Sequence, residues 1–475
     1  MAATGEKLSV VEKIGYGLGE MPTGFIFYIM LVFQTFFYTN VFGLTPAEAG
    51  TLLLVARISD ALFDPIMGTV ADRTSTRWGK FRPWVLWTAV PFGVLSFMVF
   101  VTPNFDHAGK LVYAYVTYIV FMTIYSANNV PYSTLSGVMT GDIAERTSVS
   151  SYRFVFAMLA GIVAKGLAPK MVNFFGSVRD ASGQLAIDPA TGQIVIDYAK
   201  GYQWTVGIFS LSCIVFFVIT FITTKERIHP DPSQRLSIRS NLADLRKNGP
   251  WKAMLGLMIF AFTMLSMRSS AIMYYFMYYL HKPDCFALFL VLSQAANIFG
   301  ILFAKPLSMR FGKRNTFIGS LFLTALVYSG FFFLSPGNII AIFVLEIISA
   351  VTYGIKIPLT WAMTADVADY SEWKTGRSAI GVVFATMIFS LKAGLGIGGA
   401  MTGWLLAAYG YSNDFAEQSE QTLLGIRLMV SIYPAVPLLI GVVCLFFYPI
   451  TKQMNIQMAE ELAERRKKLP VSTAD

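Results

Sequence analysis

Thr51-Leu-Leu-Leu-Val-Ala-Arg57-Ile-Ser-Asp60-Ala-Leu-Phe-Asp64-Pro-Ile-Met-Gly-Thr-Val70 is a mainly apolar stretch with three charged residues near its centre. It is long enough to cross a bilayer as a helix, which takes about 20 residues. Arg57, Asp60 and Asp64 recur at helical spacing and therefore share one face. A charge at the centre of a bilayer costs about 2.5–3.5 kcal/mol on insertion scales. The stretch therefore indicates a membrane protein in which these charges are paired, hydrated or used.

The whole chain has the composition of a membrane protein. Of its 475 residues, 55% are hydrophobic and 14% are charged, whereas soluble domains carry about 25% charged residues. Apolar runs of about 20 residues recur along the chain, which predicts membrane-spanning helices. A membrane β-barrel is excluded, because its strands alternate in character and are only about 10 residues long. The predicted fold class is an all-α polytopic membrane protein.

Twelve candidate spans follow from the apolar runs. They are 22–42, 46–71, 83–102, 110–135, 151–175, 203–223, 251–280, 285–305, 315–335, 337–361, 378–408 and 424–449. The longest polar break separates six spans from six. It predicts an N-terminal bundle at 1–222, a cytoplasmic middle loop at 223–250, a C-terminal bundle at 251–450 and a cytoplasmic tail at 451–475.

The charge distribution fits membrane topology better than nucleic-acid binding. The formal net charge is +9, but most Lys and Arg residues lie in alternate loops, which predicts that both termini are cytoplasmic. Residues 1–16 lack the apolar core and cleavage site of a signal peptide. The three cysteines do not suggest a disulfide framework, and the three histidines have no metal-ligand spacing.

The two halves of the chain contain similar sequence motifs at equivalent positions. Arg77-Trp-Gly-Lys80 after the second span resembles Arg310-Phe-Gly-Lys313 after the eighth, and residues 139–144 resemble residues 363–368. Two matches in the same order at equivalent loops indicate a duplicated six-helix unit. That organisation is typical of a transporter whose halves rock around a site between them.

Four segments, 50–68, 77–83, 129–132 and 365–376, are similar to motifs of the glycoside–pentoside–hexuronide:cation symporters in the major facilitator superfamily. The resemblance covers nearly the whole chain. It implies the major facilitator fold, with twelve transmembrane helices in two pseudo-symmetric six-helix bundles. It also implies a symporter of the cell inner membrane that works by alternating access and functions as a monomer. Its partners would be the bilayer, a sugar (a pentoside, hexoside or hexuronide) and a coupling cation.

The resemblance and the charge pattern together predict a coupling-ion site. Its residues are Asp60, Asp64, Ser126, Lys392 and Arg57. Two carboxylates one helical turn apart repel each other, so one tends to hold a proton or share a cation. Lys392, in an apolar and glycine-rich span, is expected to pair with one of them. The alternative is a structural ion cluster that locks spans two and eleven together.

The coupling ion is expected to be H+, with Na+ possible. The family's galactoside carrier has an Asn directly before its second carboxylate, and Phe63 stands there in this chain. A sodium ion needs several oxygen ligands, whereas a proton needs only a suitably placed carboxylate. The chain has no Gly-x-x-x-x-Gly-Lys-Ser/Thr loop, so ATP is not the expected energy source, and no cofactor is expected.

The predicted substrate-binding residues come from spans one, four, five and ten. They are Arg153, Asn129, Asn128, Trp361, Tyr28, Gly24 and Glu20. Three have a structural alternative: Arg153 could bind lipid phosphate, Asn128 could make an interhelical hydrogen bond, and Glu20 could lie near the membrane surface.

Gly24 and Asn129 stand where the galactoside carrier of the family has acidic residues, so a galactoside is not the expected substrate. Their loss makes the site more positive, as do further basic residues within spans, which are Lys165, Arg268 and Lys356. A neutral pentoside or glucoside is favoured over a hexuronide.

A third set of residues lies close to the predicted cytoplasmic surface. It comprises Arg77, Lys80, Arg82, Asp142, Asp366 and Asp369, which the sequence places in loops. We expect them to form ion pairs that hold the inner ends of the two halves together in the outward-open state. The alternative is simple topology, because basic residues accumulate in cytoplasmic loops.

Two rival functions remain at this point. A lysolipid or other amphiphile could be the substrate, since related animal carriers keep the second-span acids. A membrane enzyme or sensor is the other rival. The sequence shows no catalytic triad, metal motif or attached signalling domain, so we expect a transporter and not an enzyme.

Overall fold

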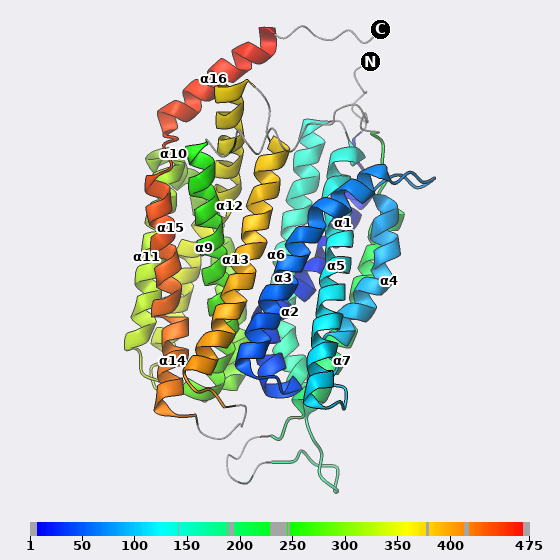
Figure 1. Ribbon diagram of the computed structural model, residues 1–475, viewed down its shortest axis with the longest axis vertical. Helices are drawn as coiled ribbons and strands as arrows, with labels where there is room; N and C mark the ends of the chain where they lie inside the picture. The colour runs from blue at the N-terminus through cyan, green and yellow to red at the C-terminus, as the bar shows by residue number, and fades with distance from the viewer. Residues whose placement is uncertain are drawn as a thin grey trace. The chain divides into compact units, whose positions relative to one another are not determined.

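The computed structural model describes residues 7–140, 142–187, 189, 194–228, 245, 248–376, 380–412 and 418–468. Almost all of these residues lie in helices, and the β-bridges among them are isolated (Figure 1). The predicted middle loop and tail lie partly outside the described residues.

The helices of the first half correspond to the first six predicted spans, with one short helix before them. They are α1 (Val10–Leu18), α2 (Glu20–Phe36) with the π-helical η1 (Phe37–Phe42), α3 (Pro46–Arg73), α4 (Arg82–Met98), α5 (His107–Met139), α6 (Ile143–Gly176) and α7 (Tyr198–Thr223).

The second half begins with α9 and adds a helix after its last predicted span. Its helices are α9 (Gly249–Tyr274) with the π-helical η2 (Tyr275–Tyr279), η3 (Pro283–Cys285), α10 (Phe286–Phe311), α11 (Lys313–Gly330) with η4 (Phe331–Phe333), α12 (Ile339–Thr375), α13 (Ile380–Ala408), α14 (Glu420–Val430), α15 (Ile432–Phe446) and α16 (Lys452–Lys468).

Each predicted span falls on one or two of these helices. Within the described residues, ten helical segments are long and apolar enough to cross a bilayer. The other two predicted spans are α4, which has only 17 residues, and α3, whose apolar stretch contains Arg57, Asp60 and Asp64. The all-α, multi-pass class is confirmed, and the count of twelve spans stays a prediction.

Several helices continue beyond the predicted spans. Apolar runs mark the hydrocarbon layer, whereas backbone hydrogen bonding continues the helix into polar sequence. The clearest case is α12, which ends at Thr375. The placement of Asp366 and Asp369 in a loop was therefore wrong, because both lie in the last turns of this helix. The sequence made no prediction of a helix before the first span, where the structure has α1.

The chain divides into two compact units, which are described separately. The first contains residues 1–232, 269–294 and 399–426, and the second contains residues 233–268, 295–398 and 427–475. Each unit combines segments that are far apart in the sequence. The boundaries expected from the sequence, at residues 222, 250 and 450, stay predictions.

In the first unit, α3 and α4 both pack against α5, and α4 also packs against α7. Helix α2 lies against α6 and α7. This packing places α3 beside α5, and α2 beside α6, which are the two neighbourhoods that hold most of the predicted site residues.

In the second unit, α11 packs against both α12 and α15. Glycines allow α10 and α12 to approach closely. A Cβ atom at Gly354 would lie 2.2 Å from the carbonyl oxygen of Asn297, and one at Gly300 would lie 2.1 Å from that of Val351. Small residues of this kind are typical of helix contacts in membranes, where close backbone packing drives association.

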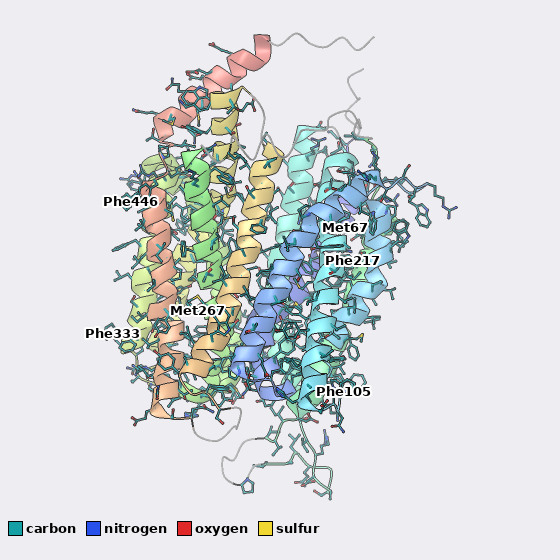
Figure 2. The ribbon with its side chains drawn as sticks, in the orientation of Figure 1. Met67, Phe105, Phe217, Met267, Phe333 and Phe446 are labelled. Carbon is teal, nitrogen blue, oxygen red and sulfur yellow. The ribbon has the colours of Figure 1, made fainter. Side chains whose placement is uncertain are left out.

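Many large apolar side chains point away from the helices (Figure 2). Phe333 is 81% exposed and Phe446 is 62% exposed, whereas Phe217 and Met267 are fully buried. Scattered exposed apolar residues are normal on any protein, but here they recur along most of the long helices. The exposed surface is therefore suited to lipid.

A buried polar cluster joins the ends of two π-helical segments in the first unit. The Asn40 side-chain amide, in η1, donates hydrogen bonds to the hydroxyls of Tyr278 in η2 and Tyr411, each at 2.5 Å. The Tyr411 hydroxyl also donates to that of Tyr278 at 2.8 Å. Because η1 and η2 follow the first span of each half, the cluster ties segments of both halves together.

We predict that Asn40→Ala destabilises the protein. Hydrogen bonds between membrane helices contribute about 0.6 kcal/mol on average and up to about 1.7 kcal/mol, and this change removes two. Thermal unfolding of the detergent-solubilised protein should begin at a lower temperature. Asn104→Ala, at an exposed loop residue, is the control. Equal unfolding temperatures for the two variants would contradict a stabilising role of the cluster.

Candidate functional site

The predicted coupling-ion residues lie on α3, which begins with a capping box. Thr45 accepts a hydrogen bond from the Glu48 backbone N–H, and Glu48 accepts one from the Thr45 N–H. Pro65 directly follows Asp64 and has no N–H, so it removes one helical hydrogen bond beside the acids. Asp60 is 1% exposed, and Asp64 is half-buried. The helix thus holds one acid in the protein interior and the other at its margin.

Ser126 of α5 connects the two acids. Its hydroxyl Oγ lies within hydrogen-bond distance of a carboxylate oxygen of Asp60, and 2.6 Å from Asp64 Oδ1. A hydroxyl has only one proton, so it can donate to only one carboxylate at a time. Two fully ionised carboxylates around this oxygen would repel each other. The geometry therefore suits a site in which a proton or a cation is shared.

Arg57 provides part of the compensating charge. Its Nη1 atom lies 4.0 Å from Asp60 Oδ2, three residues along the same helix, and the side chain is only 8% exposed. Three of the predicted coupling-site residues, together with Arg57, therefore meet between α3 and α5.

The predicted substrate residue Arg153, on α6, makes an ion pair with Glu20 at the start of α2. The Arg153 Nε atom lies 2.5 Å from Glu20 Oε2. Arg153 also lies over the ring of Tyr132, at 5.2 Å from the centroid. Both charged side chains are only partly exposed. Glu20 and Arg153, which were predicted separately, therefore act as one charge pair.

Arg153 is connected to Asn129 through the Ser133 hydroxyl. Arg153 Nη2 donates to the Ser133 hydroxyl at 3.2 Å, and that hydroxyl donates to Asn129 Oδ1 at 3.3 Å. Asn128 has a different environment, because it is fully buried and its amide donates to Thr88 of α4 at 2.7 Å. This is the interhelical bond that the sequence left open as the alternative for Asn128, and its role in substrate binding stays a prediction.

Residues one helical turn apart on α2 and α6 face each other along what we call the α2/α6 seam. It consists of Glu20, Gly24 and Tyr28 on α2, and Arg153, Ala157, Gly161 and Lys165 on α6. A Cβ atom at Gly24 would lie 2.6 Å from that of Ala160, so glycine allows the close crossing. Four of the seven predicted substrate residues lie on this seam.

Lys392 and Trp361 belong to the second unit. Lys392, on α13, is 8% exposed. A Cβ atom at the nearby Gly394 would lie 2.5 Å from the Ile259 carbonyl oxygen of α9. Trp361, on α12, stacks on Phe384 with the ring centroids 6.4 Å apart. The predicted pairing of Lys392 with the α3 acids, and the predicted role of Trp361, stay predictions.

The predicted gate residues of the first unit bond to neighbours in that unit. The Glu226 carboxylate accepts the backbone N–H groups of Lys80, Phe81 and Arg82 at 2.7–2.8 Å, which fixes the start of α4. A Cβ atom at Gly79 would lie 2.4 Å from the Glu226 carboxyl carbon, and the glycine has a φ of +111°. Glycine is therefore required at this turn.

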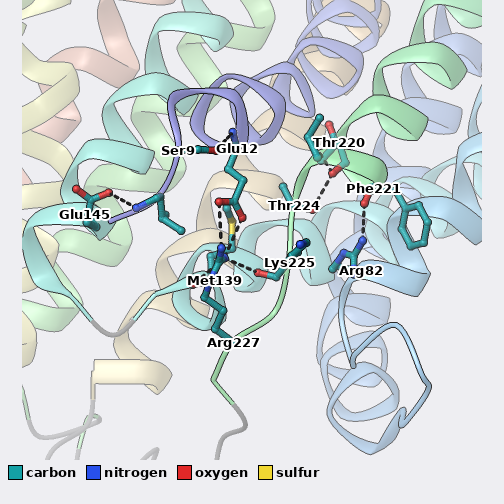
Figure 3. Close-up of polar contacts among 12 residues, drawn as sticks. Ser9, Glu12, Arg82, Met139, Glu145, Thr220, Phe221, Thr224, Lys225 and Arg227 are labelled. Atoms are coloured by element: carbon teal, nitrogen blue, oxygen red, sulfur yellow. Dashed lines mark hydrogen bonds and ion pairs between the residues drawn. The ribbon is translucent and has the colours of Figure 1, made fainter. Parts of the chain in front are cut away.

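Further contacts hold the same end of the first unit (Figure 3). Arg82 Nη2 donates to the Phe221 carbonyl oxygen at 2.7 Å, and Arg227 makes an ion pair with Glu12 at 2.9 Å. Asp142 accepts the backbone N–H of Glu145 at the start of α6. Arg77 lies 4.9 Å from the ring centroid of Trp78.

In the second unit, Asp366 has a basic partner. Lys313 Nζ donates to both of its carboxylate oxygens, at 2.7 and 2.8 Å, and Asn455 of α16 donates at 2.9 Å. Asp366 and Asp369 both line a cavity of about 420 Å³. The ion pair between the segments that follow spans eight and ten supports the expectation that acidic and basic residues pair here. A clasp between the two halves stays a prediction.

The sequence did not single out Lys165, Gln294 or Glu226 as site residues. Lys165 was visible only as one of several basic residues within spans. Gln294 and Glu226 gave no signal, because their importance comes from contacts with helices far away in the sequence: Gln294 with α6 and Glu226 with the turn before α4.

Comparisons with known proteins agree on the family. The model of the family described as MFS/sugar transport protein matches residues 15–452. The inner membrane symporter YicJ of Escherichia coli is 35% identical, over 98% of this chain and 97% of its own. The isoprimeverose transporter of Lactiplantibacillus pentosus is 33% identical, over 93% and 89%. A glucuronide carrier protein homolog of E. coli is 30% identical, over 97% of each chain.

Solved structures support the fold. A bacterial homolog of the human lysosomal transporter Spinster, in an inward-facing conformation, matches with a TM-score of 0.63, covering 94% of this chain and 97% of its own. The nucleoside transporter NupG matches with a TM-score of 0.60, covering 93% and 99%. Sequence identities of 14% and 12% limit these matches to the fold. The chain therefore belongs to the MFS/sugar transport protein family, whose members are membrane transporters and not enzymes.

Proposed function

We propose that this protein is a secondary active symporter that imports a sugar or glycoside with H+ by alternating access. The observation that carries the proposal is the Ser126 hydroxyl between Asp60 and Asp64. The family match and the relatives named as sugar or glycoside transporters support sugar as the substrate class. They favour it over the alternative of a lysolipid or other amphiphile.

The contacts of the α3 acids support a proton as the coupling ion. When one carboxyl group is protonated, it can donate to the Ser126 oxygen while the hydroxyl donates to the other carboxylate. This arrangement satisfies both acids without a further ligand. Na+ remains the alternative, but Phe63 provides no oxygen where the family's galactoside carrier has an amide.

A proton gradient is a sufficient energy source. One charge that moves through about 100 mV releases about 2.3 kcal/mol. At about 1.4 kcal/mol for each tenfold change in concentration, this supports about 50-fold accumulation of a neutral sugar. In the proposed cycle, Asp60 and Asp64 take up the proton on the outer side, and residues on the α2/α6 seam bind the sugar. The loaded carrier then opens inward and releases both.

The distribution of charged residues and one named relative support a specific membrane and a specific side for the termini. The concentration of Lys and Arg in alternate loops supports cytoplasmic termini. One relative that matches over nearly its whole length is named an inner membrane symporter, which supports the cell inner membrane. We expect the protein to function as a monomer and to bind no nucleic acid.

Asp64→Asn tests the coupling step. The amide cannot exchange a proton in the physiological range, so we expect concentrative sugar uptake into proteoliposomes to fall to the level of equilibration. Radiolabelled sugar uptake with an imposed pH gradient measures this. Asp72→Asn, at an exposed acid near the end of the same helix, is the matched control. Concentrative uptake by Asp64→Asn equal to that of the control would contradict the proposal.

Ser126 gives a second, independent test. Ser126→Ala removes the hydroxyl that both acids contact, whereas Ser126→Thr keeps a hydroxyl at the same position. We expect the proton-driven uptake rate to fall about tenfold or more in the alanine variant, which corresponds to about 1.4 kcal/mol, and to stay close to wild type in the threonine variant. If alanine and threonine behaved alike, the shared hydroxyl would have no role in coupling.

A further inference from the structure

A groove follows one face of α11 in the second unit. It has a volume of about 400 Å³, and residues of α10 and α12 form its sides. We call it the α11 groove, and its α11 residues are Asn315, Thr316, Gly319, Ser320 and Leu323. These residues recur at helical spacing and therefore form one stripe, which extends about 12 Å along the helix.

The two ends of the α11 groove differ in polarity. Asn315 lies in the first turn of α11 and begins the predicted span 315–335, which places this end at the membrane boundary. Leu323 lies about two turns deeper and is 43% exposed, on the apolar surface that is suited to lipid. The groove thus changes from polar to apolar in the same direction as a phospholipid does from its headgroup to its acyl chains.

Gly319 keeps the middle of the groove open. A Cβ atom at this exposed glycine would meet no atom of a described neighbouring residue within 4 Å. Gly300 and Gly354 differ, because a Cβ atom at either would collide with the backbone of the adjacent helix. Glycine is less favourable than alanine inside a helix. Gly319 therefore does not serve helix packing, and its missing side chain leaves space for a ligand.

The polar end of the groove is next to an exposed arginine. Arg310, in the last turn of α10, lies 5.3 Å from the ring centroid of Phe311, which lines the groove. The neighbouring basic residues are engaged elsewhere. Lys313 is paired with Asp366, and Arg314 donates to two carbonyl oxygens at the end of α15. Arg310 is therefore the basic group that is placed to meet an anion at this end.

The start of α11 adds further donors. Its N-cap is Gly312, which has no side chain to cap the first N–H groups of the helix. Such N–H groups attract anions, and phosphate above all. Thr316 provides an independent observation, because it is only 8% exposed and its hydroxyl has no hydrogen-bond partner among the described residues. A buried polar group of this kind calls for a ligand or an ordered water.

We propose that the α11 groove binds an anionic phospholipid. The lipid phosphate accepts charge-assisted hydrogen bonds from Arg310 and lies at the N-terminus of α11. Asn315 and the Thr316 hydroxyl donate to the oxygens of the glycerol ester region, and one acyl chain passes Gly319 toward Leu323. Basic side chains at a membrane boundary attract anionic lipids. This inference goes beyond the proposed symport and does not depend on it.

Two lipids that differ only in their headgroup test the inference. The purified full-length protein, freed of lipid, is titrated with dioleoyl phosphatidylglycerol or dioleoyl phosphatidylcholine, and native mass spectrometry measures the affinity of the first bound lipid. The wild-type protein should bind the anionic lipid at least about fivefold more tightly, which corresponds to about 1 kcal/mol. Arg310→Gln should bind the two lipids about equally. Arg73→Gln, at an exposed arginine in the last turn of α3, is the control and should keep the preference.

Filling the groove gives a second test. Gly319→Leu places a side chain in the open space without a clash, so the tight phosphatidylglycerol site should be lost while the protein stays folded. Gly381→Leu is the matched control, because this exposed glycine of α13 also has no described neighbour within 4 Å of a Cβ atom. It should bind phosphatidylglycerol as the wild type does.

Several results would overturn the inference. One is a wild-type protein that binds both lipids equally, and another is a Gly319→Leu variant that keeps the tight site. A dimer that Gly319→Leu abolishes would assign the groove to a second copy of the chain instead. The wild-type comparison and Arg310→Gln decide the question even if Gly319→Leu fails to fold. Failure of solute-driven proton flux would count against the proposed function alone.

Discussion

Two carboxylates that share one hydroxyl within a bilayer are the constraint around which the first unit is organised. Asp60 and Asp64 are one turn apart on α3, and Ser126 of α5 contacts both. In hydrocarbon, an ionised acid needs a partner, water or a bound ion. The single hydroxyl proton can satisfy one acid at a time. A shared proton or cation relieves the repulsion between two neighbouring carboxylates, which is the basis of the proposed coupling step.

The fold supports this arrangement from several sides. The capping box at Thr45 fixes the start of α3, and its packing against α5 brings Ser126 to the acids. Arg57 offsets part of their charge at 4.0 Å from Asp60. On the neighbouring α2 and α6, Arg153 is held by Glu20 and linked through Ser133 to Asn129. The two α3 acids and the α2/α6 seam thus lie in the same compact unit, and the proposed symport requires that the two be coupled.

The sequence predicted what local patterns determine. Helical spacing placed Arg57, Asp60 and Asp64 on one face, and apolar runs placed each predicted span on a helix. It left open an interhelical hydrogen bond for Asn128 but did not identify Thr88 as the partner. It did not predict the ion pair of Arg153 with Glu20 or the bond between Lys165 and Gln294, because partners on different helices leave no mark in local sequence. It also ended α12 too early and missed α1, because hydropathy marks the membrane layer and not the ends of hydrogen-bonded helices.

The most direct test of proton coupling uses the wild-type protein alone. Proteoliposomes in sodium-free buffer would be given an inward proton gradient, and sugar uptake and external pH would be recorded together. Proton coupling at the α3 acids predicts sugar accumulation above equilibrium, accompanied by alkalinisation of the external medium. Accumulation that requires added Na+ and does not respond to the proton gradient would contradict it.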